Sequence, residues 1–461
     1  MMNLRVGAAI ALAAGGVGCD PVVVPLPDER QTVVELPVTP NRDLDLLFVV
    51  DDSPSMLDKQ LNLTANFPSF LDRLQTVTGG LPNLHVGVVT TDMGTLASGS
   101  AMPGPPIGQV GNGGCASTGK NGALQTGNAQ VNGRFLVDVE AAGGTRSRNY
   151  AGTLAEAFRA IASAGAGGCG FEQPLAAMRA ALDNNAANAG FLRAEAMLGV
   201  VFLADEDDCS AKSTALFGPE SMALGPLQSF RCTRFGVTCT EGGATADAMN
   251  TVGAKSGCAP SVGSDLLDDV GPYRDFLLGL KRDPRRVVVA GILGPVEPFG
   301  VEPRAPPGGG SPQPGLSHSC TYKGPNGTEV ADPAVRLKGF LDGFPDRSAL
   351  TSICERDLSG GLMQVAEVFR RSIGSPCVEA MLADAKPGTD GLQADCVVED
   401  LVGASAIEIP SCEANLSARP CWRLEPDAAT CTGFLNLKLV VQRDAAPDPA
   451  TVTRMRCAVA P

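Results

Sequence analysis

The sequence predicts an α/β fold: a doubly wound, mainly parallel sheet with helices on both faces. Two observations carry this prediction. Short apolar runs, typical of strands that are buried on both faces, recur along the chain. Segments with apolar residues at helical spacing separate these runs, and parallel strands need such crossover helices between them.

The predicted strands and helices alternate from residue 44 to residue 376. Buried strands are expected at 44–50, 84–90, 198–204 and 286–293. Helices are expected at 56–74, 153–162, 173–182, 273–280 and 362–373. Pro68 is expected to kink the first helix, and Gly374 and Pro376 are expected to end the last one.

Three Gly/Pro-rich segments interrupt the alternation, near 94–150, 208–265 and 297–345. Each contains at least one cysteine, so we interpret them as long insertions at the sheet ends that disulfides hold in place. Low-complexity decoration is the alternative. From Cys377 onward, short strand-like patterns and six cysteines predict a small, disulfide-stapled β domain over 377–461.

The N-terminus predicts export. Arg5 precedes an apolar run, Val6 to Val17, that is too short to span a bilayer and is typical of a signal peptide over residues 1–18. The run ends in a sequence that resembles a bacterial lipobox, so we expect a lipid anchor on Cys19. A plain signal peptide with an incidental cysteine is the alternative. Residues 19–41 are expected to form an extended spacer.

Cysteine content and charge narrow the possible functions. Fourteen of the fifteen cysteines remain once Cys19 is set aside, and an exported chain can pair them into seven disulfides. The net charge is −14, and no cluster of Lys and Arg occurs. Nucleic acid is therefore excluded as an expected partner, because neutralising phosphates needs clustered cations.

Oxygen-bearing side chains follow two of the predicted strands. Asp51, Ser53 and Ser55 come directly after the first strand, and Asp205 directly follows the third. The carboxyl ends of parallel strands meet at one edge of a sheet, so these side chains are expected to converge. Carboxylates and hydroxyls suit a hard cation such as Mg²⁺ or Ca²⁺. A solvated acidic loop is the alternative.

The Asp-x-Ser-x-Ser pattern resembles the metal-ion-dependent adhesion site of von Willebrand factor type A domains. Segments 90–94, 168–175 and 205–210 are similar to secreted, cysteine-rich lipoproteins of myxobacteria and their relatives. The resemblance implies a type A domain over 42–376, with metal ligands at Asp51, Ser53, Ser55 and Asp205. The family also has a Thr ligand near position 169, where this chain has Cys169, a poor ligand for a hard cation. Glu172 could supply an oxygen instead.

The stretch from Asp205 to Asp208 is strongly acidic, and we expect Asp52 and Asp92 to join it in one acidic rim. Repulsion among so many carboxylates favours neutralisation by solvent or by a cation. Cys169 and Cys209 lie in loops expected to be adjacent, so a disulfide between them across the rim is a further expectation.

The resemblance implies a binding or adhesion module in the cell envelope, lipid-anchored in the outer membrane or at the cell surface, that engages a protein or surface ligand. A structural envelope lipoprotein with the same fold and no metal is the alternative. An enzyme is not expected. Gly114 to Lys120 fits the first part of a P-loop, but Asn121 replaces the Ser or Thr that would hold Mg²⁺. Neither histidine has a recognisable nucleophile motif such as G-x-S-x-G with it.

Overall fold

The computed structural model describes most of the chain beyond residue 30. The described residues are 31–37, 42–77, 80–141, 144–305, 311–374, 376–378, 380–402, 405–413, 419–428, 431, 434–445, 447 and 451–460. The predicted signal peptide and the predicted lipid anchor at Cys19 lie outside these residues.

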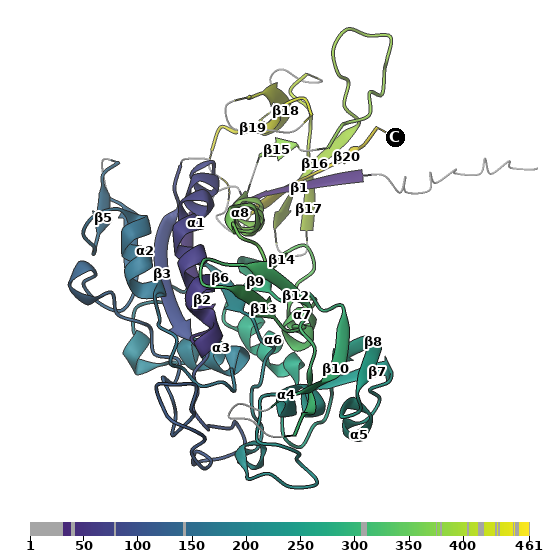
Figure 1. The fold of residues 1–461 in the computed structure, drawn as a ribbon. Coiled ribbons are helices and arrows are strands. Elements are labelled where there is room, and N and C mark those ends of the chain that lie inside the picture. The colour runs from purple at the N-terminus through teal and green to yellow at the C-terminus, as the bar shows by residue number, and fades with distance from the viewer. Residues whose placement is uncertain are drawn as a thin grey trace, which may run out of the picture.

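A seven-stranded sheet with strand order β14-β9-β6-β2-β3-β4-β5 forms the centre of the molecule (Figure 1). Its five parallel strands are β2 (Asp43–Val50), β3 (Asn83–Thr90), β6 (Met197–Ala204), β9 (Val287–Leu293) and β14 (Ser348–Ser352). Two antiparallel strands, β4 (Leu136–Glu140) and β5 (Arg146–Arg148), extend one edge. The predicted mainly parallel α/β sheet is therefore confirmed.

Helices cover both faces of the sheet. One face packs on α1 (Leu57–Gln75), α2 (Leu154–Ala162) and α8 (Ser359–Gly374), and the other on α3 (Pro174–Leu182), α6 (Val270–Gly279) and α7 (Val335–Leu341). Successive residues of a strand point to opposite faces. Phe48 of β2 accordingly meets Phe158 of α2 at 4.9 Å between ring centroids, while Leu47 and Val49 join the opposite core.

Each predicted strand and helix is present, with boundaries that differ by a few residues. Thr153 caps α2 through a reciprocal capping box with Glu156, which fixes where that helix starts. Helix α1 runs through Pro68. Within the central sheet and the helices that cover it, β4, β5, β14 and α7 were not predicted; the three strands are short and half-exposed in parts, without a continuous apolar run.

The insertions are folded and share structure with one another. The second and third build one antiparallel sheet from β7 (Val237–Glu241), β8 (Gly253–Pro260), β10 (Phe299–Arg304) and β11 (Gln313–Leu316). The second also contains α4 (Phe230–Gly236) and α5 (Ala246–Met249), and the third a hairpin of β12 (Cys320–Lys323) and β13 (Thr328–Ala331). In Figure 1 most of this material lies below the sheet, at the carboxyl ends of its parallel strands.

The C-terminal region forms two small sheets at the other end of the molecule (Figure 1). One contains β16 (Cys396–Val402), β17 (Ser405–Ile409) and β20 (Val452–Ala458), and the other β15 (Cys377–Val378), β18 (Cys421–Pro426) and β19 (Leu437–Gln442). Strand β1 (Gln31–Pro37) pairs along its whole length with β20. Part of the expected spacer is thus a strand, because its extended backbone completes the hydrogen bonding of β20.

Seven disulfides join the fourteen cysteines of the described residues. The pairs are 115–169, 209–232, 239–258, 320–354, 377–431, 396–457 and 412–421. The expected Cys169–Cys209 pair is wrong, because each of the two cysteines bonds to a partner in an insertion. Disulfides persist in oxidising compartments, so this set indicates an extracytoplasmic protein. Among the described helices, none has both the length and the apolar character needed to cross a bilayer.

Candidate cation site

The predicted tripod is a tight turn between β2 and α1. The Asp51 amide donates to the Leu203 carbonyl of β6 at 2.9 Å, so the two neighbouring strands end together. The Ser53 amide donates to Asp51 Oδ1 at 2.8 Å, and the Ser53 and Ser55 hydroxyl oxygens lie 3.1 Å apart. Asp51 is buried, whereas Ser55 is exposed. The turn therefore holds one buried carboxylate and two hydroxyls, the outer of which reaches the surface.

Asp205 lies beside this turn, as the sequence predicts. It directly follows β6, and its negative charge raises the pKa of Asp51, which burial has already raised well above its usual range. One oxygen of each carboxylate, Asp51 Oδ2 and Asp205 Oδ1, is buried without a hydrogen-bond partner. A buried ionised carboxylate is costly unless a counter-charge or a proton neutralises it. These two oxygens are the ones that a bound cation would neutralise.

Lys59 of α1 holds the other oxygen of Asp205. Its ammonium lies 2.9 Å from Asp205 Oδ2 and 2.9 Å from Glu329 Oε2 of β13. Burial lowers the pKa of Lys59, but Asp205 and Glu329 raise it more, so the ammonium stays charged. One oxygen of Asp205 is thus neutralised by Lys59, and the other has no hydrogen-bond partner.

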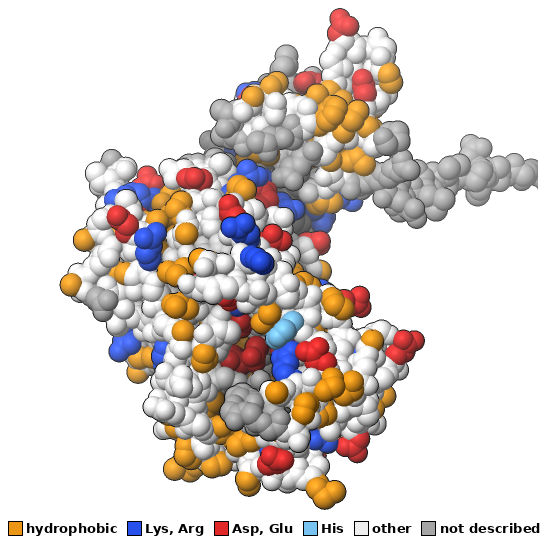
Figure 2. Space-filling model, viewed as in Figure 1, with side chains coloured by type: hydrophobic (Ala, Val, Ile, Leu, Met, Phe, Trp, Pro, Cys, Tyr) orange, Lys and Arg blue, Asp and Glu red, His pale blue; other side chains and the backbone are white. Residues whose placement is uncertain are grey.

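Glu172, the residue expected to replace the missing Thr, is part of the same acidic group. It is buried, its Oε1 has no partner, and burial followed by the charges of Glu206 and Asp51 raises its pKa well above the usual range. Burial and the charges of Asp332 and Asp205 raise the pKa of Glu206 to about 8. Figure 2 shows acidic side chains inside a recess between the body of the molecule and the insertions.

The tripod has two further neighbours: Thr91, which the sequence did not indicate as part of the site, and Glu206, a member of the predicted acidic rim. Thr91 is buried, and its hydroxyl lies 3.5 Å from Asp51 Oδ1, at the limit of a hydrogen bond. Glu206 joins through its charge contacts with Asp205 and Glu172. Thr91 follows β3 as directly as Asp51 follows β2, so the rule that parallel strands end at one edge was the signal that could have found it.

Cys169 occupies the loop where the von Willebrand type A resemblance implies a Thr, and its sulfur is bonded to Cys115. The backbone of this loop still approaches the tripod, because the Gly168 amide donates to the Asp52 carbonyl at 2.7 Å. A Cβ at Gly168 would lie only 2.3 Å from Asp52 Oδ1, so any larger residue here would displace the Asp52 carboxylate. The disulfide therefore fixes a loop that contributes close packing beside the tripod in place of a Thr hydroxyl.

The acidic run is divided between two roles. Asp205 and Glu206 face the tripod, but Asp207 accepts hydrogen bonds from the Arg336 and Leu337 amides at the start of α7. Burial raises the pKa of Asp207 to about 6, although those hydrogen bonds oppose the shift. Asp208 pairs with buried Arg336 at 2.9 Å. The expected rim is therefore smaller than predicted, because its last two carboxylates anchor a helix.

Asp52, the next residue after Asp51, forms an ion pair with a lysine of the chain. Lys120 Nζ is 2.6 Å from Asp52 Oδ2, so the lysine of the P-loop-like stretch serves as a counter-ion there. Burial raises the pKa of Asp52, Lys120 lowers it, and the charge of Asp92 raises it again, which places Asp92 nearby as expected.

The donor set mixes carboxylates with hydroxyls. Within the described part of the chain, no three His, Cys, Asp or Glu side chains form a group that could hold a metal by themselves. Asp51 and Asp205 would thus need the hydroxyls of Ser53 and Ser55 to complete a shell. Such an all-oxygen set suits Mg²⁺ or Ca²⁺.

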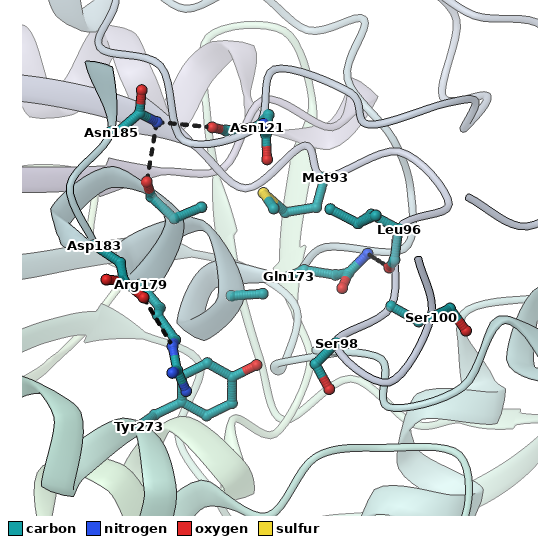
Figure 3. A pocket seen from close by; sticks show the side chains of 13 residues that line it. Met93, Leu96, Ser98, Ser100, Asn121, Gln173, Arg179, Asp183, Asn185 and Tyr273 are labelled. Carbon is teal, nitrogen blue, oxygen red and sulfur yellow. Dashed lines mark hydrogen bonds and ion pairs between the residues drawn. The ribbon is translucent and has the colours of Figure 1, made fainter. Parts of the chain in front are cut away.

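A separate cavity of about 520 Å³ lies beside α3 and α6 (Figure 3). Met93 and Leu96 form an apolar part of its wall, and Tyr273 and Arg179, which pairs with Asp183, also line it. The side chains of Asp51, Ser53, Ser55 and Asp205 do not line this cavity. It is therefore distinct from the candidate cation site.

Comparisons with known proteins leave the family open. No protein-family model matches the chain, and no curated protein matches it. Among solved structures, the pilus adhesin RrgA from Streptococcus pneumoniae is 11% identical, with a TM-score of 0.30 over 95% of this chain and 60% of the adhesin chain. The human COPII-coat protein Sec24c is 9% identical, with a TM-score of 0.27 over 90% of this chain and 44% of the Sec24c chain. This chain thus spans less than two thirds of either neighbour, and likenesses this low assign neither family nor function.

Proposed function

We propose that this chain is an extracytoplasmic binding module of the von Willebrand type A kind that uses Mg²⁺ or Ca²⁺ to engage a protein or cell-surface ligand. Asp51, Ser53, Ser55 and Asp205 supply the oxygen ligands in this proposal, with Glu172 as a further candidate. The observation that carries it is the pair of buried, unpartnered oxygens, Asp51 Oδ2 and Asp205 Oδ1. Unsatisfied buried carboxylates are rare unless a site needs them.

The surrounding residues support such a role by orienting the ligands. The Ser53 amide holds Asp51 Oδ1, and Gln60 Nε2 donates to the Asp51 carbonyl at 2.8 Å, so the turn is fixed from both sides. Exposed Ser55 lies where a partner can approach. A bound cation would supply the positive charge to which an acidic group of the partner could bind. No catalytic role is proposed for any residue.

The lipid anchor at Cys19 remains part of the proposal. It would place the binding module on the cell envelope, in the outer membrane or at the cell surface, through lipid alone. Labelling with palmitate tests this directly: the label is expected on the wild-type chain and absent from Cys19→Ser. Equal labelling of the two proteins would contradict the anchor.

A structural envelope lipoprotein without metal is the second candidate. Two observations favour it: Lys59 already neutralises one oxygen of Asp205, and Cys169 is locked in a disulfide where the family has a Thr ligand. In this view the disulfides provide stability, and the acidic recess is a solvated surface.

Calorimetric titration of the oxidised protein with Mg²⁺ and with Ca²⁺ separates the two candidates. Binding that Asp51→Ala abolishes is expected for the cation-dependent module. Asp283→Ala is the matched control, because Asp283 lies before β9, outside the candidate site, and its loss should leave binding unchanged. Absence of binding at millimolar metal, or binding that Asp51→Ala leaves intact, would favour the structural role.

A further inference from the structure

A fully buried lysine connects the candidate cation site to the β12–β13 hairpin. The Lys59 side chain is 0% exposed, and its ammonium lies 2.9 Å from both Asp205 and Glu329. It also donates to the Ser55 carbonyl at 3.1 Å. One positive charge is thus shared between a candidate ligand and the hairpin.

Polar contacts hold the hairpin beside the tripod. Asn326 Nδ2, at the turn, donates to Asp58 Oδ1 of α1 at 2.5 Å, and the Asp332 amide donates to the Asp205 carbonyl at 2.8 Å. Most hairpin residues are half-exposed or exposed, and the core contacts lie at its base, near Ala331 and Cys320. The position of the outer hairpin therefore depends on charged and polar groups, among which the Lys59–Glu329 pair is the most buried.

Lys59 and a cation would compete for the same carboxylate. Asp205 Oδ2 contacts Lys59, and Asp205 Oδ1 is buried without a hydrogen-bond partner. A divalent ion at Oδ1 would repel the ammonium across a single carboxylate, and such repulsion is strong where water is excluded. Glu329, at the same 2.9 Å from the ammonium, is the group that can balance Lys59 once the ion takes over Asp205.

We propose that Lys59 is an internal counter-ion that sets the cation affinity of this site and couples cation binding to docking of the β12–β13 hairpin. The inference rests on the proposed function, because it assigns the regulation of that same site. Without a cation, Lys59 neutralises Asp205. With a cation bound, Lys59 is balanced by Glu329, so the ion strengthens the contact that holds the hairpin. Coupling between two sites is reciprocal, so a docked hairpin also favours the bound ion.

Two single substitutions should change cation affinity in opposite directions. Lys59→Gln removes the repulsion, so we expect calorimetry with Ca²⁺ to show binding tighter by about fivefold or more. Glu329→Gln leaves the ammonium to Asp205 alone, so binding should weaken by a similar factor. The matched controls are Lys281→Gln, a buried lysine 3.9 Å from Asp45 at the far end of β2, and Glu302→Gln on β10. Neither control should change the affinity.

Hydrogen exchange provides a second readout that does not depend on affinity. Ca²⁺ is expected to slow the exchange of amides within residues 320–331 in the wild type and to leave them unchanged in Lys59→Gln. The inference is overturned if the wild type binds Ca²⁺ while Lys59→Gln and Glu329→Gln match it or shift affinity in the same direction. It is equally overturned if the wild type binds Ca²⁺ and the exchange of its hairpin amides does not change.

The outcome also separates this inference from the proposed function. Binding by Lys59→Gln alone would mean that Lys59 blocks the wild-type site, which supports the inference and removes the cation from the function of the natural chain. If neither protein binds Ca²⁺ or Mg²⁺, both ideas are wrong. Binding by the wild type that Asp51→Ala abolishes, with no effect of Lys59→Gln, leaves the function standing without the coupling.

Discussion

Two buried aspartates lie at the two ends of strand β2: Asp45 near its start, and Asp51 directly after its last residue. The charges nearest to Asp45 are positive, whereas those nearest to Asp51 are negative. The Asp45 carboxylate accepts hydrogen bonds from the Arg193 amide and from Arg193 Nε, each at 2.7 Å, and Lys281 Nζ lies 3.9 Å from the same carboxylate. Asp51 Oδ1 accepts a hydrogen bond from the Ser53 amide, and Asp51 Oδ2 has no hydrogen-bond partner. Burial raises the pKa of both carboxyls, but only at Asp51 do neighbouring carboxylates raise it further.

The difference separates a structural charge from one kept for a ligand. At Asp45 the fold supplies cations from its own chain, so burial there is compensated. At Asp51 the nearest charges are acidic, an arrangement that costs stability until a counter-charge arrives. Proteins retain such costs mainly where function requires them.

The largest expected effect comes from removing the partner of Asp45. Arg193→Leu removes the hydrogen-bonded partner of a buried carboxylate and leaves it only the longer contact with Lys281, so the free energy of unfolding should fall by about 3 kcal/mol. Urea denaturation measures this, with Arg274→Leu as the control, because its exposed pair with Asp275 should contribute less than about 1 kcal/mol. An equal, small loss in both variants would remove the contrast between the ends of β2.

Neutralising the two aspartates should have opposite effects. Without divalent cations, Asp51→Asn removes an unpaired buried charge and should stabilise the protein by about 1 kcal/mol. Asp45→Asn breaks the pairing with Arg193 and should destabilise it by about 2 kcal/mol. Parallel urea denaturation in the presence of a chelator checks both. Destabilisation of similar size in both variants would show that Asp51 is as well compensated as Asp45.

The acidic group also predicts a dependence on pH. Glu206 has a folded-state pKa of about 8 against an ordinary value of 4.5, so the folded protein holds a proton that the unfolded chain has lost. This contribution to stability is complete below about pH 4.5 and disappears as pH rises through about 8. The free energy of unfolding, measured without divalent cations, should therefore fall over that interval. Glu206→Gln should flatten the decline, and exposed Glu302→Gln should not; a decline that both variants share would place its source elsewhere.

The smallest effect is expected at Asp52, on the edge of the site. Lys120 pairs with it at 2.6 Å, but the lysine side chain is 36% exposed. Solvent screens such a pair, so Lys120→Gln should lower the free energy of unfolding by only about 0.5 to 1 kcal/mol. Thermal unfolding measures it beside Arg193→Leu. A loss as large as that of Arg193→Leu would mean that Lys120 stabilises Asp52 as strongly as Arg193 stabilises Asp45.

The central sheet could be predicted well because its central strands are continuous apolar runs. Runs such as Leu198 to Ala204 are apolar at every position, so strand, burial and parallel pairing follow from one pattern. The convergence of Asp51 and Asp205 followed from the same logic. Strand β1 was missed because β20, the strand with which it pairs, lies at the far end of the chain.

The electrostatics of the site could not be predicted in the same way. Lys59 pairs with Glu329, 270 residues away, and nothing local marks that lysine as buried. Asp205 and Asp208 are three residues apart in one acidic run, yet one faces the tripod and the other pairs with Arg336. Such choices depend on which helix ends and loops the fold brings close. The von Willebrand type A resemblance and the metal itself remain predictions.

Unfolding in urea with and without Mg²⁺ tests the central claim most directly, in three proteins: wild type, Asp45→Asn and Asp51→Asn. A ligand that binds only the folded state stabilises it by about 2.7 kcal/mol at a concentration one hundred times its Kd. Mg²⁺ should therefore stabilise the wild type and Asp45→Asn by the same amount and leave Asp51→Asn unchanged. Equal stabilisation of all three, or of none with either Mg²⁺ or Ca²⁺, would contradict the assignment of Asp51 to a cation.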